Sequence, residues 1–379
     1  MRILAYSSYY RPYTSGLTVY LERVLKNIEY DATVITFKHD ASLPRTELVG
    51  NVTIKRMPFL FRVSKGFISP QSWLTFFLEA RRHDVIVLNI PNAEAAPLAL
   101  IGHLMNKRII ALYHCDIAFG HGGGSQIIKA FLQLSISLQL MLADHVVAYP
   151  DYVESLKFYK QYRHKITTSL PPIEVAPADE SFLSTLKKTK AKKRWVGFVG
   201  RFSREKGIEY LIGALKHLKR ADIELILVGP KKSQVVGEQK YHDLIMTILK
   251  ESDIPYRVFS SPSDAELSAI YHALDVLVLP SVNSTEAFGM VQAEAMVCGT
   301  PVVATDLPGI RQPVTLTGNG KIVPPSDLVR MAHAIDSVVG SSKSRADVTK
   351  SAKKIFDASK IYSFYTKLLA RNKQISIRK

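Results

Sequence analysis

Two glutamates with seven residues between them bound the segment 286–294 (EAFGMVQAE). An apolar run at 275–279 and a loop precede this segment, so it is expected at the carboxyl end of a strand. On a helix, eight positions rise about 12 Å, which is too far for a close acid–base pair. Such carboxylates suit hydroxyl groups at opposite ends of one elongated ligand, and Gly289 would let that ligand approach the backbone. The simpler interpretation is an ordinary helix with Glu286 near its N-terminus, where the helix dipole favours a negative charge.

A second candidate site is the segment 200–207 (GRFSREKG), where a strand is expected to end and a helix to begin. The cations Arg201, Arg204 and Lys206 cluster at this junction. Free N–H groups at a helix start favour an anion, and neighbouring cations add charge-assisted hydrogen bonds. The segment therefore predicts a cradle for a phosphate or diphosphate, or else a basic surface turn.

Two weaker signals lie in the first half of the chain. His114 and Asp116, in the segment 113–116 (YHCD), follow another apolar run at 108–113, where catalytic groups are often placed. Gly16 lies in the loop after the first apolar run and opens a helical pattern. Both have ordinary structural explanations, because the chain contains 11 histidines and loop glycines are common.

The elements that must position these residues alternate between strand and helix. Continuous apolar runs of the kind buried on both faces of a parallel sheet predict strands at 3–7, 33–37, 85–90, 108–113, 145–149, 195–200, 224–228, 275–279, 301–304 and 321–323. Helical patterns between them lie at 17–27, 94–106, 126–143, 152–162, 205–219, 239–251, 264–274, 287–298 and 327–339. The alternation predicts an α/β protein with two doubly wound Rossmann-like domains. We expect a proline-marked junction near 171–194.

The formal net charge of +17, with a pI near 9.6, is the unusual feature of the composition. A basic balance suits nucleic acid, an anionic membrane surface or phosphate-bearing substrates. Most of the excess stands in two short segments, 187–194 (KKTKAKKR) and 343–379. Such charge runs are most often solvated linkers or tails.

Several classes of protein are disfavoured by the sequence. With two distant cysteines, Cys115 and Cys298, no disulfide framework or Cys-x-x-Cys metal pair can form, which fits a reducing cytosol. The apolar stretch 127–143 is interrupted by Lys129 and two glutamines, so it is expected to be a buried or interfacial helix rather than a membrane span. P-loop, zinc and nucleic-acid-binding signatures are missing from the sequence, as is a hydrolase Ser elbow to accompany the glycines at 122–124.

Taken together, the segments of the second half resemble the retaining glycosyltransferases of family four, which have the GT-B fold. The resemblance rests on 200–207, 223–230 (IELILVGP), 264–281, 286–310 and, more weakly, 321–327, in the family's order and spacing. Segments 9–24 and 113–116 match more loosely. The resemblance implies two domains facing across a cleft and a C-terminal helix that crosses back to the first. We therefore expect an acceptor-side domain at 1–175, joined by the tail at about 357–379, a basic linker at 176–194, and a donor-binding domain at 195–356.

The resemblance also assigns roles to residues. Arg201 and Lys206 match the pair that neutralises the donor diphosphate, and Gly16 matches the glycine loop below it. Glu286 and His114 match the groups beside the reacting sugar. The family's backbone stretch that meets sugar and phosphate is matched by Phe288, Gly289 and Met290. Its ribose-binding glutamate is matched by Glu294. The sequence departs from the family's pattern at Ser15, at 229–232 and at Gln312. These departures affect the expected contacts to the donor base more than the expected reaction.

The function implied is transfer of a sugar from a nucleotide diphosphate sugar, such as a UDP- or GDP-hexose, to an acceptor hydroxyl with retention of configuration. A glycan or lipid-linked acceptor is expected, in glycan, polysaccharide or glycolipid assembly, with no metal and no nucleic acid. The two basic segments suggest contact with an anionic membrane surface, so the expected location is cytoplasmic, including a peripheral position on the inner face of the membrane. Two alternatives stay open: a GT-B nucleotide-sugar epimerase, and a basic lipid- or nucleic-acid-binding protein with a degenerate sugar site.

Overall fold

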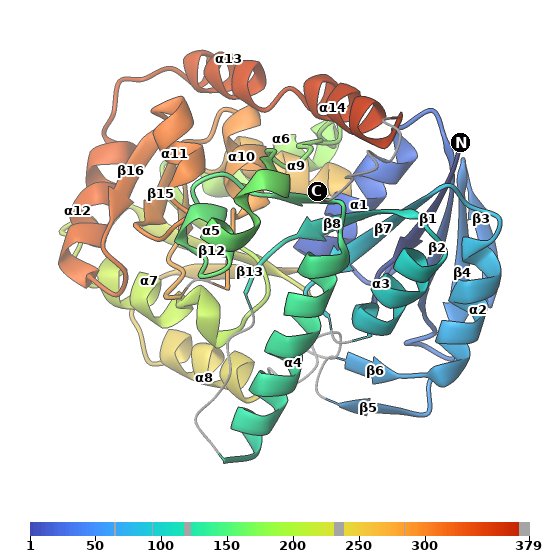
Figure 1. Cartoon of the computed structure of the whole chain (residues 1–379). Coiled ribbons are helices and arrows are strands. Elements are labelled where there is room, and N and C mark those ends of the chain that lie inside the picture. The colour runs from blue at the N-terminus through green and yellow to red at the C-terminus, as the bar shows by residue number, and fades with distance from the viewer. Residues whose placement is uncertain (64–65, 93, 117–122, 231–238, 284, 371–379) are drawn as a thin grey trace. The chain divides into compact units, whose positions relative to one another are not determined.

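The structure is a computed structural model of the 379-residue chain, shown in Figure 1. It describes every residue except 64–65, 93, 117–122, 231–238, 284 and 371–379. The chain divides into a first unit, Met1–Pro172 with Ala358–Lys379, and a second unit, Ile173–Asp357. The last described helix, α14 (Ala358–Ala370), therefore belongs to the first unit, although it follows the whole of the second in sequence.

The first unit is built on an eight-stranded sheet in the order β10-β9-β8-β7-β1-β2-β4-β3. All neighbouring strands run parallel except β3 and β4, which are antiparallel. The strands are β1 (Arg2–Tyr6), β2 (Asp31–Phe37), β3 (Thr46–Val49), β4 (Val52–Met57), β7 (Val85–Ile90), β8 (Arg108–Tyr113), β9 (His145–Ala148) and β10 (Ile166–Thr168), with a separate hairpin of β5 (Phe61–Val63) and β6 (Gly66–Ile68). Every residue of β7 and β8 is buried, as expected for central strands of a parallel sheet.

Helices cover both faces of this sheet. They are α1 (Gly16–Lys26), α2 (Pro70–Ala80), α3 (Ala95–Leu104), α4 (Gly123–Leu142), α5 (Tyr159–Tyr162) and α14, with short 3₁₀ turns at Val153–Ser155 and Arg163–Lys165. Ser15 caps α1 by accepting the Thr18 N–H, and Thr18 reciprocates on the Ser15 N–H. Helix α14 is fixed to the unit by Arg108, which donates to the carbonyls of Leu368 and Leu369.

The second unit has a six-stranded parallel sheet in the order β13-β12-β11-β14-β15-β16, the strand order of a dinucleotide-binding fold. Its strands are β11 (Arg194–Val199), β12 (Ile223–Gly229), β13 (Tyr256–Ser260), β14 (Val276–Leu279), β15 (Val302–Thr305) and β16 (Gly320–Val323). The helices around it are α6 (Glu180–Lys190), α7 (Ile208–Leu215), α8 (Gln239–Lys250), α9 (Asp264–Ala273), α10 (Met290–Val297), α11 (Gln312–Thr317), α12 (Leu328–Val339) and α13 (Arg345–Ile355), with a 3₁₀ turn at Arg204–Lys206.

The expected architecture of two doubly wound Rossmann-like units is confirmed, while several elements differ from their predicted bounds. The helix expected at 205–219 is split, because Gly207 adopts a left-handed conformation between the 3₁₀ turn and α7. The helix expected at 152–162 is broken into a 3₁₀ turn and the single turn of α5. Strand β13 was not predicted, because it is an edge strand of half-buried residues without a continuous apolar run.

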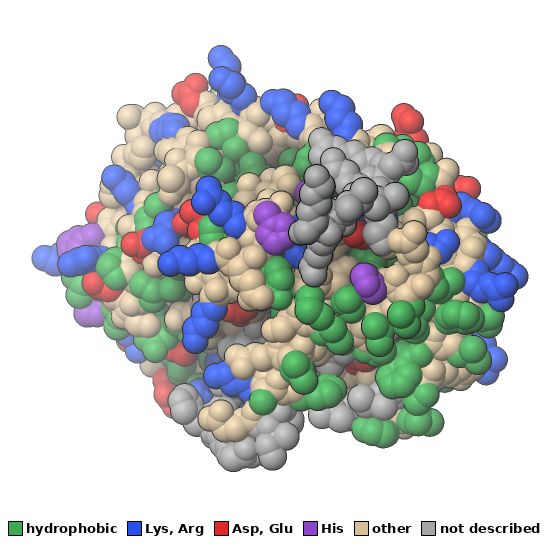
Figure 2. Space-filling view, viewed as in Figure 1, with side chains coloured by type: hydrophobic (Ala, Val, Ile, Leu, Met, Phe, Trp, Pro, Cys, Tyr) green, Lys and Arg blue, Asp and Glu red, His purple; other side chains and the backbone are tan. Residues whose placement is uncertain are grey.

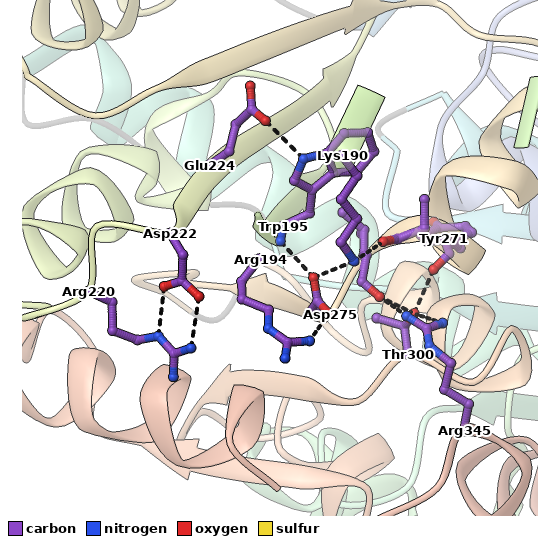
Figure 3. A network of polar contacts seen from close by, with 12 residues as sticks. Lys190, Arg194, Trp195, Arg220, Asp222, Glu224, Tyr271, Asp275, Thr300 and Arg345 are labelled. Atoms are coloured by element: carbon purple, nitrogen blue, oxygen red, sulfur yellow. Dashed lines mark hydrogen bonds and ion pairs between the residues drawn. The ribbon is translucent and has the colours of Figure 1, made fainter. Parts of the chain in front are cut away.

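The basic run at 187–194, predicted to be part of a linker, is instead largely structured. Helix α6 buries Leu183 and Leu186 and packs against α9. Lys190, the last residue of α6, and Arg194 pair with Asp275, at 2.5 and 3.3 Å, as Figure 3 shows. The run is therefore part of the second unit, and several of its charges are neutralised there.

This polar network lies at the amino ends of the strands, opposite the edge where a ligand is expected. Asp275 precedes β14 and also accepts the Trp195 N–H at 2.7 Å, which ties β11 to β14. Nearby, Arg345 of α13 donates to the Leu274 carbonyl and to Thr300 Oγ at 3.2 Å (Figure 3). The network therefore attaches α6 and α13 to the base of the sheet.

No described helix is long and apolar enough to cross a bilayer.

Candidate functional site

The topological switch point of the second unit lies between β11 and β14, which are neighbours in the sheet although β12 and β13 separate them in sequence. Ligands of such sheets bind in the crevice outside the carboxyl ends of the strands at this point. The two segments that follow these strands are 200–207 and 280–289. The sequence had singled out both, and the fold places them side by side, as the Val282 N–H bond to the Glu205 carbonyl (3.0 Å) shows.

Lys206 and Glu286, one from each segment, form an ion pair at the switch point. Both side chains are largely buried, with exposures of 12% and 19%. Arg201 pairs with Glu205 at 3.2 Å within the first segment and stays partly exposed. Partial burial lowers the effective dielectric, so these cations interact with an incoming anion more strongly than solvated ones would. The switch point therefore holds cations that are already oriented by carboxylates.

Two glycines in left-handed conformations give these segments their shape. Gly207 has φ +62°, and a Cβ there would lie 2.5 Å from the Pro280 carbonyl oxygen. Gly289 has φ +69°, and a Cβ there would lie 2.5 Å from a Leu279 methyl. Only glycine fits both the backbone conformation and the close approach at these positions.

Helix α10 begins at Met290, after Gly289 as its N-cap, and no side chain caps it. The helix expected at 287–298 therefore begins three residues later, and Glu286 lies in the preceding loop. Gly289, in its left-handed conformation, separates Glu286 from the helix, and Glu286 pairs with Lys206. The N-terminus of α10 presents its positive dipole end at the same loop.

Glu294 and Phe288, the other residues expected at this site, occupy different surroundings. Glu294 lies within α10, is nearly buried, and accepts a hydrogen bond from the Tyr271 hydroxyl at 3.1 Å. The Phe288 ring is buried and packs edge-on against Phe356, and the Phe288 carbonyl accepts a hydrogen bond from Gln292 Nε2 at 3.1 Å. The fold thus brings Lys206 to Glu286 directly, while Glu294 is held separately by Tyr271.

A second cluster of candidate residues lies in the first unit, around its own switch point between β1 and β7. His114, directly after β8, bonds through Nε2 to the Asn89 amide oxygen. Asn89 in turn donates to Ser7 Oγ at 3.1 Å and to the Leu17 carbonyl at 3.4 Å. Gly16, the first residue of α1, directly precedes Leu17, whose carbonyl accepts this bond from Asn89. Gly16 therefore lies next to the cluster in sequence.

These contacts define the protonation of His114. Because the Asn89 amide nitrogen donates elsewhere, its oxygen must accept, so His114 Nε2 carries the proton. Nδ1 then accepts from the Tyr149 hydroxyl at 3.3 Å. Complete burial lowers the pKa of His114 to about 3 from its ordinary value of 6.5. The imidazole is neutral at physiological pH and can accept or polarise without carrying charge.

The lowered pKa of His114 predicts how stability depends on pH. Between pH 6.5 and 3 the unfolded chain binds a proton at this position that the folded chain does not. The wild type should therefore lose about 1.4 kcal/mol of unfolding free energy per pH unit below 6.5 through this group. We expect His114→Gln to remove that slope, as measured by urea unfolding at about pH 7 and pH 5. The exposed His217 provides a control, and equal slopes for His114→Gln and wild type would contradict the burial argument.

Sequence reasoning had missed Asn89, Tyr149 and Glu205. A signal for Asn89 was present, because it is the one polar residue in the apolar run 85–90. The other two reach their partners only through the fold.

Among the described residues, no group of three or more His, Cys, Asp or Glu side chains is placed to hold a metal ion.

Among the similarities to known proteins, a family match falls within the second unit. Residues 183–355 match the family described as glycosyl transferases group 1. The matched segment contains the Lys206–Glu286 pair, the N-terminus of α10 and Glu294, so the site built above lies wholly inside the part of the chain that resembles this family.

Curated relatives match a part of the chain of similar length. An uncharacterized glycosyltransferase of Methanocaldococcus jannaschii is 32% identical over 165 residues, which cover 43% of this chain and 40% of the relative. A D-inositol 3-phosphate glycosyltransferase of Mycobacterium marinum is 30% identical over 168 residues, covering 44% of this chain and 34% of the relative. The match thus spans two-fifths or less of the length of either relative.

Solved structures match nearly the whole chain, including both units. HepE of Anabaena in complex with UDP-glucose gives a TM-score of 0.76 at 20% identity, covering 98% of this chain and 99% of that one. Sucrose-phosphate synthase of Thermosynechococcus elongatus gives 0.74 at 20% identity, covering 97% and 99%. At such identities the likeness establishes the fold, which is GT-B.

Proposed function

We propose that the protein transfers a sugar from a nucleotide diphosphate sugar to an acceptor hydroxyl with retention of anomeric configuration. The observation that carries the proposal is the Lys206–Glu286 pair at the switch point of the second unit, within the segment that matches the group 1 family. A cation next to a carboxylate suits a donor whose diphosphate and sugar hydroxyls must be bound side by side. The cation would take the phosphate and the carboxylate would accept from the sugar.

The proposed reaction uses charges that are fixed before the donor binds. As the bond between sugar and diphosphate breaks, negative charge develops on the leaving phosphate. Lys206, Arg201 and the N-terminus of α10 would stabilise that charge without reorganising, which is the most effective form of electrostatic catalysis. Glu286 is not assigned as a covalent nucleophile, since the acceptor in this mechanism attacks from the face that the leaving group vacates.

The substrate classes are proposed from the relatives. HepE is described in complex with UDP-glucose, and a trehalose-phosphate synthase of Burkholderia xenovorans in complex with glucose-6-phosphate. The Mycobacterium marinum relative is named for D-inositol 3-phosphate. These names support a nucleotide hexose as donor and a hydroxyl-bearing acceptor, and a UDP-hexose is the first donor to test. A glycan or lipid-linked acceptor remains our expectation.

The donor can be identified by a thermal-shift screen with UDP, GDP and ADP sugars. A ligand at about 100 times its Kd should stabilise the folded protein by about 2.7 kcal/mol. Transfer is then followed by NMR of the anomeric proton in donor and product, with and without a chelator. Retained configuration and an unchanged rate in the chelator are expected.

The same screen distinguishes the alternatives. Conversion of the donor sugar without any acceptor would identify an epimerase. Salt-sensitive polynucleotide binding, together with no response to any nucleotide sugar, would replace the proposal with a basic binding protein.

A further inference from the structure

Helix α2 exposes a row of large apolar side chains instead of burying them. Trp73, Leu74, Phe77 and Leu78 recur at helical spacing on one side of the helix, and Leu74 is 61% exposed. Phe76 and Ala80, on the opposite side, are buried against the first unit. The helix is therefore apolar on both sides, and one of these sides has no partner among the described residues of its unit.

Helices α3 and α4 extend this exposed surface. Helix α3 packs against both α2 and α4, so the three lie side by side. Leu104 of α3 and Leu134 of α4 are 75% and 69% exposed. Figure 2 shows hydrophobic side chains gathered over these helices. We call this surface, made by the exposed apolar side chains of α2, α3 and α4, the apolar face.

The second unit provides a contrast within the same chain. Its exposed large apolar side chains stand singly on different elements, for example Leu244 on α8, Leu316 on α11 and Val329 on α12. Scattered exposed hydrophobic residues are normal on protein surfaces, whereas a contiguous patch marks an interaction site. The concentration of exposed apolar side chains on three adjacent helices therefore indicates a surface that binds a partner.

The charges around the apolar face identify that partner. Among the described residues of α2, α3 and α4 the only carboxylate is Glu79, which is buried and paired with Lys55 at 2.8 Å. Arg81 and Arg82, directly after α2, and Lys129 on α4 are exposed. Two exposed carboxylates, Asp84 and Asp144, stand nearby, directly before β7 and β9. The three helices themselves carry exposed Trp, Phe and Leu side chains with Lys and Arg on or next to them and no exposed carboxylate, which fits the headgroup–acyl boundary of an anionic bilayer.

We infer that the apolar face docks on the surface of an anionic lipid bilayer. A second copy of the chain fits less well, because a symmetric contact would bring two basic rims together on chains that each carry +17. This contact differs from the one expected from sequence, in which the run 187–194 and the tail 343–379 met the lipid. Lys190, Lys193 and Arg194 of that run face Asp275 and Glu224 instead.

Vesicle flotation of the full chain tests the inference. Wild type should float with vesicles of phosphatidylcholine and phosphatidylglycerol, and less with phosphatidylcholine alone. The triple variant Leu74→Glu/Leu104→Glu/Leu134→Glu should lower the partition coefficient at least about tenfold, because it removes apolar contact and adds repulsion. The matched variant Leu244→Glu/Leu316→Glu/Val329→Glu changes three exposed apolar positions of the second unit, 42–50% exposed against 61–75% on the apolar face, and should float like wild type.

Tryptophan fluorescence of the wild type gives a second readout, which does not depend on the triple variant being folded. The chain has two tryptophans, and Trp195 is fully buried in the second unit, so a change in emission reports Trp73. Anionic vesicles should shift the wild-type emission to the blue, and Trp73→Phe should abolish the shift. Absence of both flotation and shift in wild type would overturn the inference. So would a wild-type dimer that the triple variant converts to monomer without any vesicle binding, since the face would then join two copies.

Discussion

Lys206→Ala should lower kcat/KM for sugar transfer by about 10²- to 10³-fold, the usual cost of removing one fixed donor from a site that stabilises developing negative charge. The loss should appear in affinity for the nucleoside diphosphate product as well, because Lys206 would contact the same phosphate before and after transfer. Calorimetric titration with the nucleotide identified in the screen measures this directly.

The size of the expected effect follows from where Lys206 lies. Its side chain is only 12% exposed, so its charge is weakly screened. Glu286 holds the ammonium group in place at the switch point, so no side-chain entropy has to be lost when the phosphate arrives. Removing the lysine also leaves the Glu286 carboxylate next to the incoming phosphate, and this repulsion adds to the loss.

Lys216→Ala serves as the control, since Lys216 is exposed at the end of α7 and lies outside the site. It should retain wild-type kinetics and wild-type stability. If Lys206→Ala transferred sugar at the wild-type rate, the assignment of the donor site would fail. The apolar face would be unaffected by that result, because flotation does not depend on the donor.

Asp275→Ala should lower the unfolding free energy of the second unit by about 3 kcal/mol, the cost of removing one partner from a largely buried ion pair. The carboxylate neutralises Lys190 and Arg194 and accepts the Trp195 N–H. Without it, the Lys190 ammonium stays at the base of the sheet with only 16% of its side chain exposed. For a unit of this size we expect the unfolding temperature to fall by roughly 6–12 °C.

The penalty of Asp275→Ala should depend on pH in a defined direction. Burial lowers the pKa of Lys190 in the wild type, and Asp275 opposes that shift. The variant loses the opposing charge, so the folded-state pKa of Lys190 falls further below that of the unfolded chain. Where the unfolded state binds more protons, stability rises with pH. The destabilisation measured by urea unfolding should therefore shrink between about pH 7 and pH 10.

Asp336→Ala is the matched control for this network. Asp336 pairs with Arg220 at 3.2 Å on the same unit, but its side chain is 54% exposed. A surface pair of this kind contributes about 0–1 kcal/mol, with no alkaline recovery. Equal losses from the two variants would show that the Asp275 contacts are not stabilising.

The parts of the fold that sequence predicted are those with the strongest local pattern. The runs at 85–90 and 108–113 are apolar apart from Asn89 and Arg108, and they became β7 and β8 with bounds that agree. Predictions failed where structure depends on a backbone conformation or a distant partner. Gly207 and Gly289 shifted the starts of α7 and α10, and no apolar periodicity reveals a left-handed glycine.

The candidate site divides in the same way. Lys206 and Glu286 could be named because each follows an expected strand, yet their contact spans 80 residues and depends on β11 and β14 being neighbours. Glu205 was hidden because acidic residues near a helix start are common, and only its contact with Arg201 gives it significance.

By itself, the sequence determined the alternation of buried strands and helices, and it placed the charged residues in loops at strand ends. Those features are local, because hydrophobic periodicity and loop residues act over a few positions of the chain. The tertiary structure alone decided which strand ends meet, what His114 bonds to, and which apolar residues stay exposed. These are properties of partners far apart in the chain, so Trp73 and Leu74 differ from core residues only in having no other element packed over them.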